Sequence, residues 1–251
     1  MKQARVLTAE FLGTFALVFF GAGAICADAL VRERIPFGSG DLLLVATAHA
    51  MVLGVMITAL GHISGAHFNP AVTVAAAVTR KIEPALAGMY VVTQLVAGVL
   101  AAALLKFVFP DAITAAVKVG APVPTPGFGG VHAIVLEAVL TFFLVTVVFA
   151  TAIDPRGAFG KIAGFGIGFV LFFDILLGGP LTGAAMNPAR AFGPALLGGV
   201  LDGTHFLTYW IGPVLGAVAA ALLYENVLIH ADEDVATDVP PPSTERVPER
   251  R

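Results

Sequence analysis

Long runs of apolar residues dominate the pattern along this chain. Five runs are about 20 residues long or longer, and a sixth is shorter and rich in glycine. Because a helix of about 20 residues crosses the ~30 Å hydrocarbon core of a bilayer, each run predicts one transmembrane helix. The predicted helices cover residues 6–27, 42–63, 85–109, 134–153, 162–177 and 206–229.

The composition supports a membrane protein and excludes several other classes. Hydrophobic residues make up 58% of the chain and charged residues only 12%, and the mean hydropathy is +0.91. A soluble domain carries about 25% charged residues, so this chain cannot cover a water-facing surface. A net charge of -3 gives no sign of nucleic-acid binding, and the single cysteine, Cys26, excludes a disulfide framework or a multi-cysteine metal site. We therefore expect no nucleic-acid partner, no cofactor and no metal.

The two ends of the chain need separate interpretations. Lys2 and Arg5 precede the first apolar run, and the small residues around 22–29 are similar to a signal-peptide cleavage site. The run is longer than the usual core of a signal peptide and contains Glu10, so we interpret it as a retained helix. Residues 231–251 are acidic, then rich in proline, then basic, which is typical of a disordered tail.

The distribution of Lys and Arg predicts the orientation in the membrane. Six helices leave both termini on one side, and the side with more Lys and Arg faces the cytoplasm. Nine basic residues fall on the side of the termini and four on the opposite side, namely Arg32, Arg34, Lys106 and Lys118. We therefore expect a multi-pass protein of the cell (plasma or inner) membrane, with both termini and the tail in the cytoplasm.

An internal repeat organises the chain. Residues 64–71 read Ser-Gly-Ala-His-Phe-Asn-Pro-Ala, and residues 182–189, which lie 118 positions later, read Thr-Gly-Ala-Ala-Met-Asn-Pro-Ala. The sequence therefore predicts two copies of a three-helix unit, at about 5–109 and 131–229, within one domain of residues 1–230. An odd number of helices per copy inverts the second copy in the membrane. Inverted repeats with broken helices have a substrate path near the midplane.

Each copy of the Asn-Pro-Ala triplet predicts the start of a short helix. Asn is a good N-cap, and Pro is favoured at the first helical position. Asn69 and Asn187 therefore begin helices at 70–78 and 188–197, each too short to cross the bilayer. In an inverted pair these half-helices enter from opposite sides and meet at their N-termini. The alternative is two surface turns in water-facing loops, and the matching positions of the two copies favour the half-helices.

These motifs resemble those of the aquaporin, or major intrinsic protein, family over about residues 10–224. The resemblance implies an all-α membrane protein with six tilted transmembrane helices and two half-helices, one pore per subunit, and a homotetramer in the lipid bilayer. Residues 150–155 and 187–195 are similar to the plant tonoplast intrinsic proteins and their bacterial relatives. The most specific stretches are residues 62–73 and 183–190, with the triplets Asn69-Pro70-Ala71 and Asn187-Pro188-Ala189.

The two Asn residues have a physical role in such a pore. Asn69 and Asn187 can both donate to one water molecule where the half-helix N-termini meet, and each N-terminus carries about half a unit of positive charge. That water must then donate its own hydrogens outward, toward both ends of the pore. This reversal opposes proton hopping, and the helix dipoles repel cations. The other interpretation, that the Asn residues cap helices, is compatible with this role.

A charged residue at membrane depth is expensive and functional by default, which singles out Arg190. The resemblance places Arg190 in a narrow outer filter with His49, Ile175 and Ala184. Arg190 would supply donors and a positive barrier, His49 a second polar contact, and the other two an apolar wall. A lone His in an apolar helix is otherwise a core residue with one backbone hydrogen bond. The set is similar to the tonoplast-type filter, which implies passage of water and small neutral solutes (ammonia, urea, glycerol) with exclusion of protons and ions.

Other functions remain as alternatives. A glycerol facilitator-type channel is one, but such channels carry Asp where this chain has Ala191 and lack the aromatic pair Tyr209-Trp210. An ion-coupled secondary transporter also uses inverted repeats, and it would need a titratable coupling site near the midplane. We expect no enzyme, because no catalytic order of Ser, His and Asp, or of Cys and His, lies outside the apolar runs.

Three acidic residues lie within the apolar runs. A buried carboxyl group needs donors, and the loops before Asn69 and Asn187 have free backbone N–H groups. The resemblance implies that Glu10 and Glu137 each hold one of these loops as structural acids. Asp174 precedes Ile175, and adjacent helical residues point about 100° apart, so Asp174 should face a neighbouring helix if Ile175 faces the pore. The loop 109–131 is expected to fold over the outer mouth.

Overall fold

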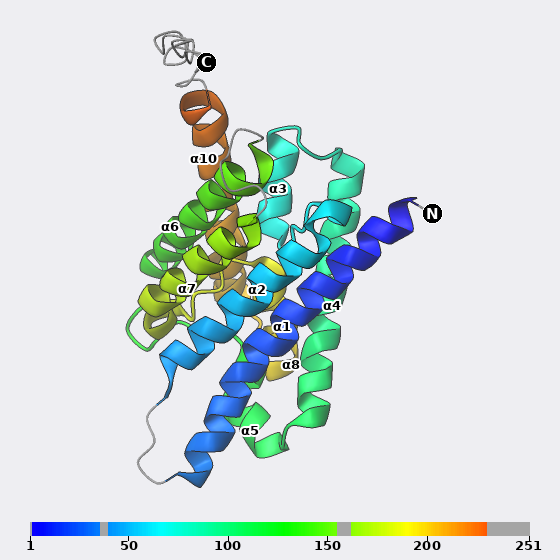
Figure 1. The fold of residues 1–251 in the computed structure, drawn as a ribbon. Coiled ribbons are helices and arrows are strands. Elements are labelled where there is room, and N and C mark those ends of the chain that lie inside the picture. Colours follow the sequence, from blue (N-terminus) through cyan, green and yellow to red (C-terminus); the bar gives the residue numbers. More distant parts are fainter. Residues whose placement is uncertain (1, 36–39, 155–161, 230–251) are drawn as a thin grey trace, which may run out of the picture.

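The structure, a computed structural model, describes residues 2–35, 40–154 and 162–229, which form helices and connecting loops without strands (Figure 1). The predicted tail at 231–251 lies outside these described residues. The first inverted unit contains α1 (Lys2–Arg34), α2 (Leu42–Ser64), α3 (Pro70–Val78) and α4 (Pro84–Val108). Between the units lie α5 (Asp111–Ala116) and the short turn η1 (Lys118–Gly120). The second unit contains α6 (Val131–Val148), η2 (Phe149–Ile153), α7 (Ala163–Thr182), α8 (Pro188–Gly198), α9 (Gly203–Phe206), η4 (Leu207–Ile211), α10 (Gly212–Leu223) and η5 (Tyr224–Leu228).

Within the described part of the chain, six helical segments are long and apolar enough to cross a membrane, which confirms the six predicted helices. The last segment, Gly203–Leu228, joins α9, η4, α10 and η5 into one continuous helix with two π-helical stretches. The first helix is longer than its apolar run, because α1 continues from residue 27 to Arg34. An ion pair between Asp28 and Arg32, at 3.0 Å and spaced i,i+4, stabilises this polar extension.

The two half-helices are present with the predicted caps. Asn69 precedes α3, and its Oδ1 accepts a hydrogen bond from the N–H of Ala71 at 2.8 Å. Asn187 precedes α8, and its Oδ1 accepts from the N–H groups of Ala189 and Arg190 at 3.0 and 3.2 Å. Figure 1 shows α3 and α8 in opposite halves of the bundle, as expected for an inverted repeat. Two surface turns are therefore excluded.

Close helix crossings hold the bundle together. The most extensive contacts join α2 to α7, across the two units, and α6 to α10, within the second unit, while α1 packs on α2 and α4 within the first unit. At the α2–α7 crossing an added side chain at Gly54 would lie 2.8 Å from the carbonyl oxygen of Gly164. Small residues at this crossing let the two backbones approach, as is usual between helices in membranes.

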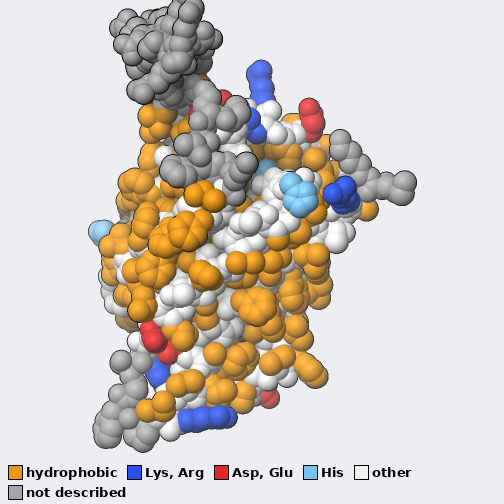
Figure 2. Space-filling view, viewed as in Figure 1, with side chains coloured by type: hydrophobic (Ala, Val, Ile, Leu, Met, Phe, Trp, Pro, Cys, Tyr) orange, Lys and Arg blue, Asp and Glu red, His pale blue; other side chains and the backbone are white. Residues whose placement is uncertain are grey.

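The outer surface fits a bilayer. Figure 2 shows hydrophobic side chains over the middle of the face formed by α1, α2 and α7, with charged side chains gathered near its two ends. Many large apolar residues of these three helices are exposed, among them Phe20 of α1, Met51 of α2 and Phe165 of α7. In water such a surface would be a liability, whereas in lipid it is matched to its surroundings.

Candidate functional site

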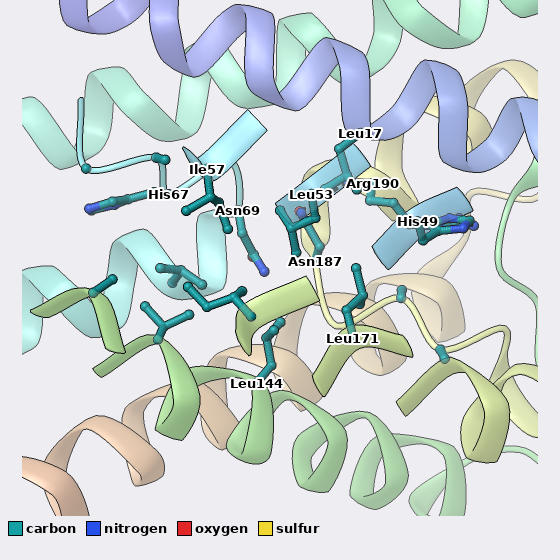
Figure 3. Close-up of a pocket in the computed structure, with 18 residues that line it drawn as sticks. Leu17, His49, Leu53, Ile57, His67, Asn69, Leu144, Leu171, Asn187 and Arg190 are labelled. Atoms are coloured by element: carbon teal, nitrogen blue, oxygen red, sulfur yellow. Dashed lines mark hydrogen bonds between the residues drawn. The ribbon is translucent and has the colours of Figure 1, made fainter. Parts of the chain in front are cut away.

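A narrow cavity lies inside the bundle, where the half-helices meet (Figure 3). His67 lies toward one end of the row, Asn69 and Asn187 lie near each other in the middle, and Arg190 lies beside His49 toward the other end. Four long helices contribute apolar side chains to the wall: Leu17 of α1, Leu53 and Ile57 of α2, Leu144 and Val148 of α6, and Ile167 and Leu171 of α7.

A buried acid holds the loop before the first half-helix. Glu10 is 0% exposed, and its Oε1 accepts from the Ser64 hydroxyl at 2.7 Å and from the N–H of His67 at 3.0 Å. Its Oε2 accepts from the N–H of Phe68 and from the side-chain amide of Gln94, both at 2.8 Å. These bonds satisfy the backbone N–H groups of His67 and Phe68, which no helix uses.

The second loop is held in the same way by Glu137, which is also fully buried. Its Oε1 accepts from the Thr182 hydroxyl at 2.7 Å and from the N–H of Ala185 at 3.0 Å, and its Oε2 accepts from the N–H of Met186 at 2.8 Å. Gln94 has no counterpart here, because Pro213 stands 119 positions later and carries no donor. Glu137 therefore has three protein donors where Glu10 has four.

The two half-helices are bonded to each other through the Asn side chains. The Nδ2 of Asn69 donates to the carbonyl oxygen of Met186 at 2.9 Å, and the Nδ2 of Asn187 donates to the carbonyl oxygen of Phe68 at 2.8 Å. Each amide has two hydrogens, so each keeps one for the cavity that it lines. This reciprocal pair, which the sequence analysis did not foresee, fixes the two amides at the centre.

Arg190 is 3% exposed, and its guanidinium is held between two partners. Its Nη1 donates to the carbonyl oxygen of Gly120 at 3.0 Å, and its Nη2 lies 3.2 Å from the Nε2 of His49. The Nδ1 of His49 lies 2.8 Å from the carbonyl oxygen of Val45, so this ring nitrogen carries the hydrogen and Nε2 is the acceptor. His49 therefore makes the backbone bond of a core histidine and also lines the cavity.

Three of the four residues expected in the filter line the cavity. His49, Ala184 and Arg190 line it, whereas on α7 the lining residues are Ile167 and Leu171. Ile175 is buried one helical turn beyond Leu171 and packs in the same apolar cluster as Ala184. The signal for Leu171 was in the sequence, because the row 167, 171, 175 on α7 repeats the row 49, 53, 57 on α2, 118 positions earlier.

Asp174 does not join this set. It is 3% exposed on α7, interacts electrostatically with Glu137, and has an Oδ2 without a hydrogen-bond partner among the described residues. The cavity wall does not include it. Asp174 therefore faces the packed interior rather than the lumen.

A sequence model of the major intrinsic proteins matches residues 1–224. The chain belongs to the major intrinsic protein family. Among its relatives, it is 44% identical over 231 residues to "Probable aquaporin TIP3-2" of Arabidopsis thaliana, covering 90% of this chain and 84% of that protein. It is 40% identical over 231 residues to "Aquaporin TIP4-4" of Zea mays, covering 90% and 87%. The solved aquaglyceroporin of Plasmodium falciparum has the same fold, with a TM-score of 0.80 at 23% identity over 93% of this chain and 99% of that one.

Membership of the major intrinsic protein family confirms several expectations from the sequence. This protein is a multi-pass membrane protein of the aquaporin type, with six transmembrane helices. It is a passive channel rather than an enzyme, and it acts in a lipid bilayer on water or small solutes. Which solutes pass depends on the side chains that line the cavity.

Proposed function

We propose that this major intrinsic protein conducts water and small neutral solutes, namely ammonia, urea and glycerol, in single file while excluding protons and ions. The observation that carries the proposal is the pair of Asn amides at the meeting point of two half-helix N-termini inside a cavity with Arg190 near one end. Movement is downhill, as expected for a passive channel of this family.

The lumen has one polar and one apolar side, which suits rapid passage. Segments 65–67 and 184–185 line the cavity, and their carbonyl oxygens accept no hydrogen bond from residues 2–35, 40–154 or 162–229. These oxygens can accept from a passing water or amine and so replace part of its hydration. The facing wall of Leu and Ile side chains offers no polar partner, so a molecule is bound weakly enough to leave.

The centre of the pore accounts for the exclusion of protons. Asn69 and Asn187 each keep one amide hydrogen for the lumen, so a water between them accepts two hydrogen bonds. Its own hydrogens then point toward the two ends of the cavity. Protons cannot hop through a file whose polarity reverses there, and the positive ends of α3 and α8 oppose any cation.

The filter accounts for the choice of solutes. The buried guanidinium of Arg190 repels cations and offers donors to a carbonyl or hydroxyl oxygen. His49 accepts from it and adds a polar edge to the wall. Ala184 is small, which leaves room for a solute larger than water, and Ile175 is proposed to close the apolar side one turn beyond Leu171. This combination favours small neutral molecules.

A glycerol facilitator-type channel is the alternative passive channel. Comparison of the water, urea and glycerol permeabilities of the protein distinguishes it from the proposed channel. An ion-coupled transporter would need a free acidic group on the path. Glu10 and Glu137 are engaged by four and three donors, and Asp174 is away from the cavity wall. The contacts of these acids therefore support the passive channel over the transporter.

We propose a homotetramer, on the basis of the family resemblance and of an exposed apolar groove between α2 and α7. The groove is lined by small residues and by the rings of Phe165, Phe169 and Phe172. Packing of a neighbouring copy would bury it. Cross-linking of the several lysine side chains of each subunit with a bifunctional amine reagent should give a ladder ending at four subunits, and monomers alone would refute the tetramer.

We also propose that the protein lies in the cell membrane with both termini in the cytoplasm. The support is the excess of Lys and Arg on the side of the termini and the even number of membrane-crossing helices in the described part of the chain. Reporter fusions at the two ends, one active only in the cytoplasm and one only outside it, test the orientation. A C-terminal reporter active outside would overturn it.

Reconstitution into liposomes tests the proposed function. After an osmotic shock, liposomes with the protein should shrink faster than empty ones and with a low activation energy, while an imposed pH gradient decays no faster. Urea, glycerol and ammonia gradients then rank the solutes. Water permeability equal to that of empty liposomes, or a proton leak that rises with protein content, would reject the proposal.

A further inference from the structure

The short turn η1, between α5 and α6, has an unusual backbone. Lys118, Val119 and Gly120 follow each other with φ values of 52°, 57° and 74°, all in the left-handed region. Val is β-branched, and a β-branched residue in this region is a genuine outlier. Such strain persists only where the surroundings fix the chain, and it is concentrated at functional sites.

The surroundings of η1 do fix it. The Val119 side chain is 1% exposed and packs against Ala22 of α1 and Leu105 of α4. Beside it Gly120 is so close to α1 that an added Cβ would lie 2.7 Å from the carbonyl oxygen of Ala22 and 2.8 Å from its Cβ. On the third side, an added Cβ at Gly198 of α8 would lie 2.5 Å from the carbonyl oxygen of Lys118. The turn is therefore wedged between three helices.

The turn η1 places one backbone carbonyl group beside the filter. The carbonyl oxygen of Gly120 accepts the hydrogen bond from Nη1 of Arg190, while His49 accepts from Nη2 on the other side. A carbonyl on a mobile loop would hold a guanidinium loosely. Here the strained turn, the anchored Val119 and the absence of a Cβ at Gly120 hold the oxygen at one position.

We propose that Gly120 is a specificity-determining residue of this channel. Its carbonyl keeps the Arg190 guanidinium against the wall of the outer mouth, so the lumen stays wide enough for solutes larger than water. The inference rests on the proposed function and adds a backbone component to the four filter side chains. If the carbonyl moves, the freed Nη1–H turns toward water in the lumen, because a buried charged donor does not stay unpaired. The mouth then narrows.

Gly120→Ala is the perturbation, and the chain offers a matched control. The new methyl group would overlap the backbone of Ala22, and Ala is itself strained at this φ, so the carbonyl must shift. Gly127 lies on the same outer loop with φ 86°, has nothing within 4 Å of an added Cβ, and lies apart from Arg190. Gly127→Ala therefore reproduces the backbone strain without touching the filter.

The measurement is the ratio of urea permeability to water permeability in liposomes. Gly120→Ala should lower the ratio about tenfold, the factor that corresponds to one charge-assisted hydrogen bond, and Gly127→Ala should leave it at the parent value. An unchanged or increased ratio in Gly120→Ala overturns the proposal. So does an equal fall in both variants, because strain alone would then explain it.

A second variant covers the case in which Gly120→Ala fails to insert. Val119→Gly removes the anchoring side chain and relieves the backbone strain, so the protein should fold while the turn loosens, and the ratio should fall in the same direction. If the ratio of urea to water permeability in Val119→Gly equals that of the parent protein, the role of the turn is refuted. A parent protein that passes no water refutes the proposed function and the inference built on it, whereas a conducting parent with unresponsive variants refutes the inference alone.

Discussion

Replacement of Glu10 by Gln tests how far the centre of the pore depends on a buried carboxylate. Glu10 accepts from Ser64, His67, Phe68 and Gln94 at distances of 2.7 to 3.0 Å. Gln has nearly the same shape, but an NH2 group with donors only replaces one acceptor oxygen. If the oxygen of the new Gln side chain still accepts the hydrogen bonds from Ser64 and His67, the new NH2 group faces the N–H of Phe68 and the amide of Gln94, which are themselves donors. Gln94 can adapt by turning its amide, whose Oε1 has no partner among the described residues. The N–H of Phe68 cannot adapt.

The expected cost follows from that single orphaned donor. A hydrogen bond to a charged group contributes about 1.5–3 kcal/mol, and a buried donor left unpaired costs a similar amount, so Glu10→Gln should lower the free energy of unfolding by about 3 kcal/mol. The effect should also reach the other half of the molecule. The carbonyl oxygen of Phe68 accepts the amide of Asn187 at 2.8 Å, so a shift of this peptide weakens both bonds. Glu10→Gln and Asn187→Ala should therefore couple by about 1 kcal/mol.

The assay is unfolding of purified protein in mixed micelles with increasing denaturing detergent, for the parent, both single variants and the double variant. Thr146→Val serves as the control partner, since its hydroxyl bonds only to the carbonyl oxygen of Phe142 in its own helix, and it should add to Glu10→Gln without coupling. A loss below about 0.5 kcal/mol for Glu10→Gln would refute the orphaned-donor reasoning. Strict additivity with Asn187→Ala would refute the link between the two halves.

Three further predictions use the liposome assay. Asn187→Asp replaces the donor with an acceptor and should lower water permeability about tenfold while raising proton leak; unchanged values would count against the central water. Arg190→Val removes the buried positive charge and should admit methylammonium, which we expect the parent to exclude; exclusion by both proteins would place the cation barrier elsewhere. His49→Phe removes the acceptor for Arg190 and adds bulk, so urea permeability should fall while water still passes. An unaltered urea flux would remove His49 from the filter.

The framework of the fold was readable from the sequence because its signals are local. A run of apolar residues long enough for a bilayer needs no partner to be recognised. The same is true of Asn followed by Pro, where the cap and the restricted ring together start a helix at 70 and at 188. Repetition of the motif then supplied the one non-local fact, which is that the short helices face each other.

Contacts to backbone carbonyl oxygens of distant segments could not be predicted in this way. The carbonyl oxygen of Gly120 that holds Arg190 has no side-chain signal, and every residue of the loop 109–131 has such an oxygen. The left-handed Val119 runs against its own propensity and is stable only because α1 and α4 surround it. The bonds from Asn69 and Asn187 to carbonyls of the opposite loop require the three-dimensional meeting of two segments.

The inverted repeat explains why the scaffold is symmetric. Glu10 and Glu137 take the same backbone donors in the two loops, and Asn69 and Asn187 cap the two half-helices and exchange amide bonds across the centre. The amide bonds of Asn69 and Asn187 cross from one copy to the other, so a change at either Asn breaks a bond to the opposite copy. The structure therefore couples the two halves at the point where the file of water must reverse.

Selectivity can still differ between the two ends of the cavity, because the residues that line its wall can change in one repeat without a matching change in the other. Arg190 has Val72 as its counterpart 118 positions earlier, and His49 has Ile167 as its counterpart 118 positions later, and all four line the cavity. The wall thus has two apolar residues at the positions that correspond, in the other repeat, to a charged and a polar one. The turn η1, whose Gly120 carbonyl holds Arg190, lies in the segment that connects the two repeats, so neither repeat contains a copy of it. A filter at one end is the outcome of a duplicated scaffold whose wall and linker were free to diverge.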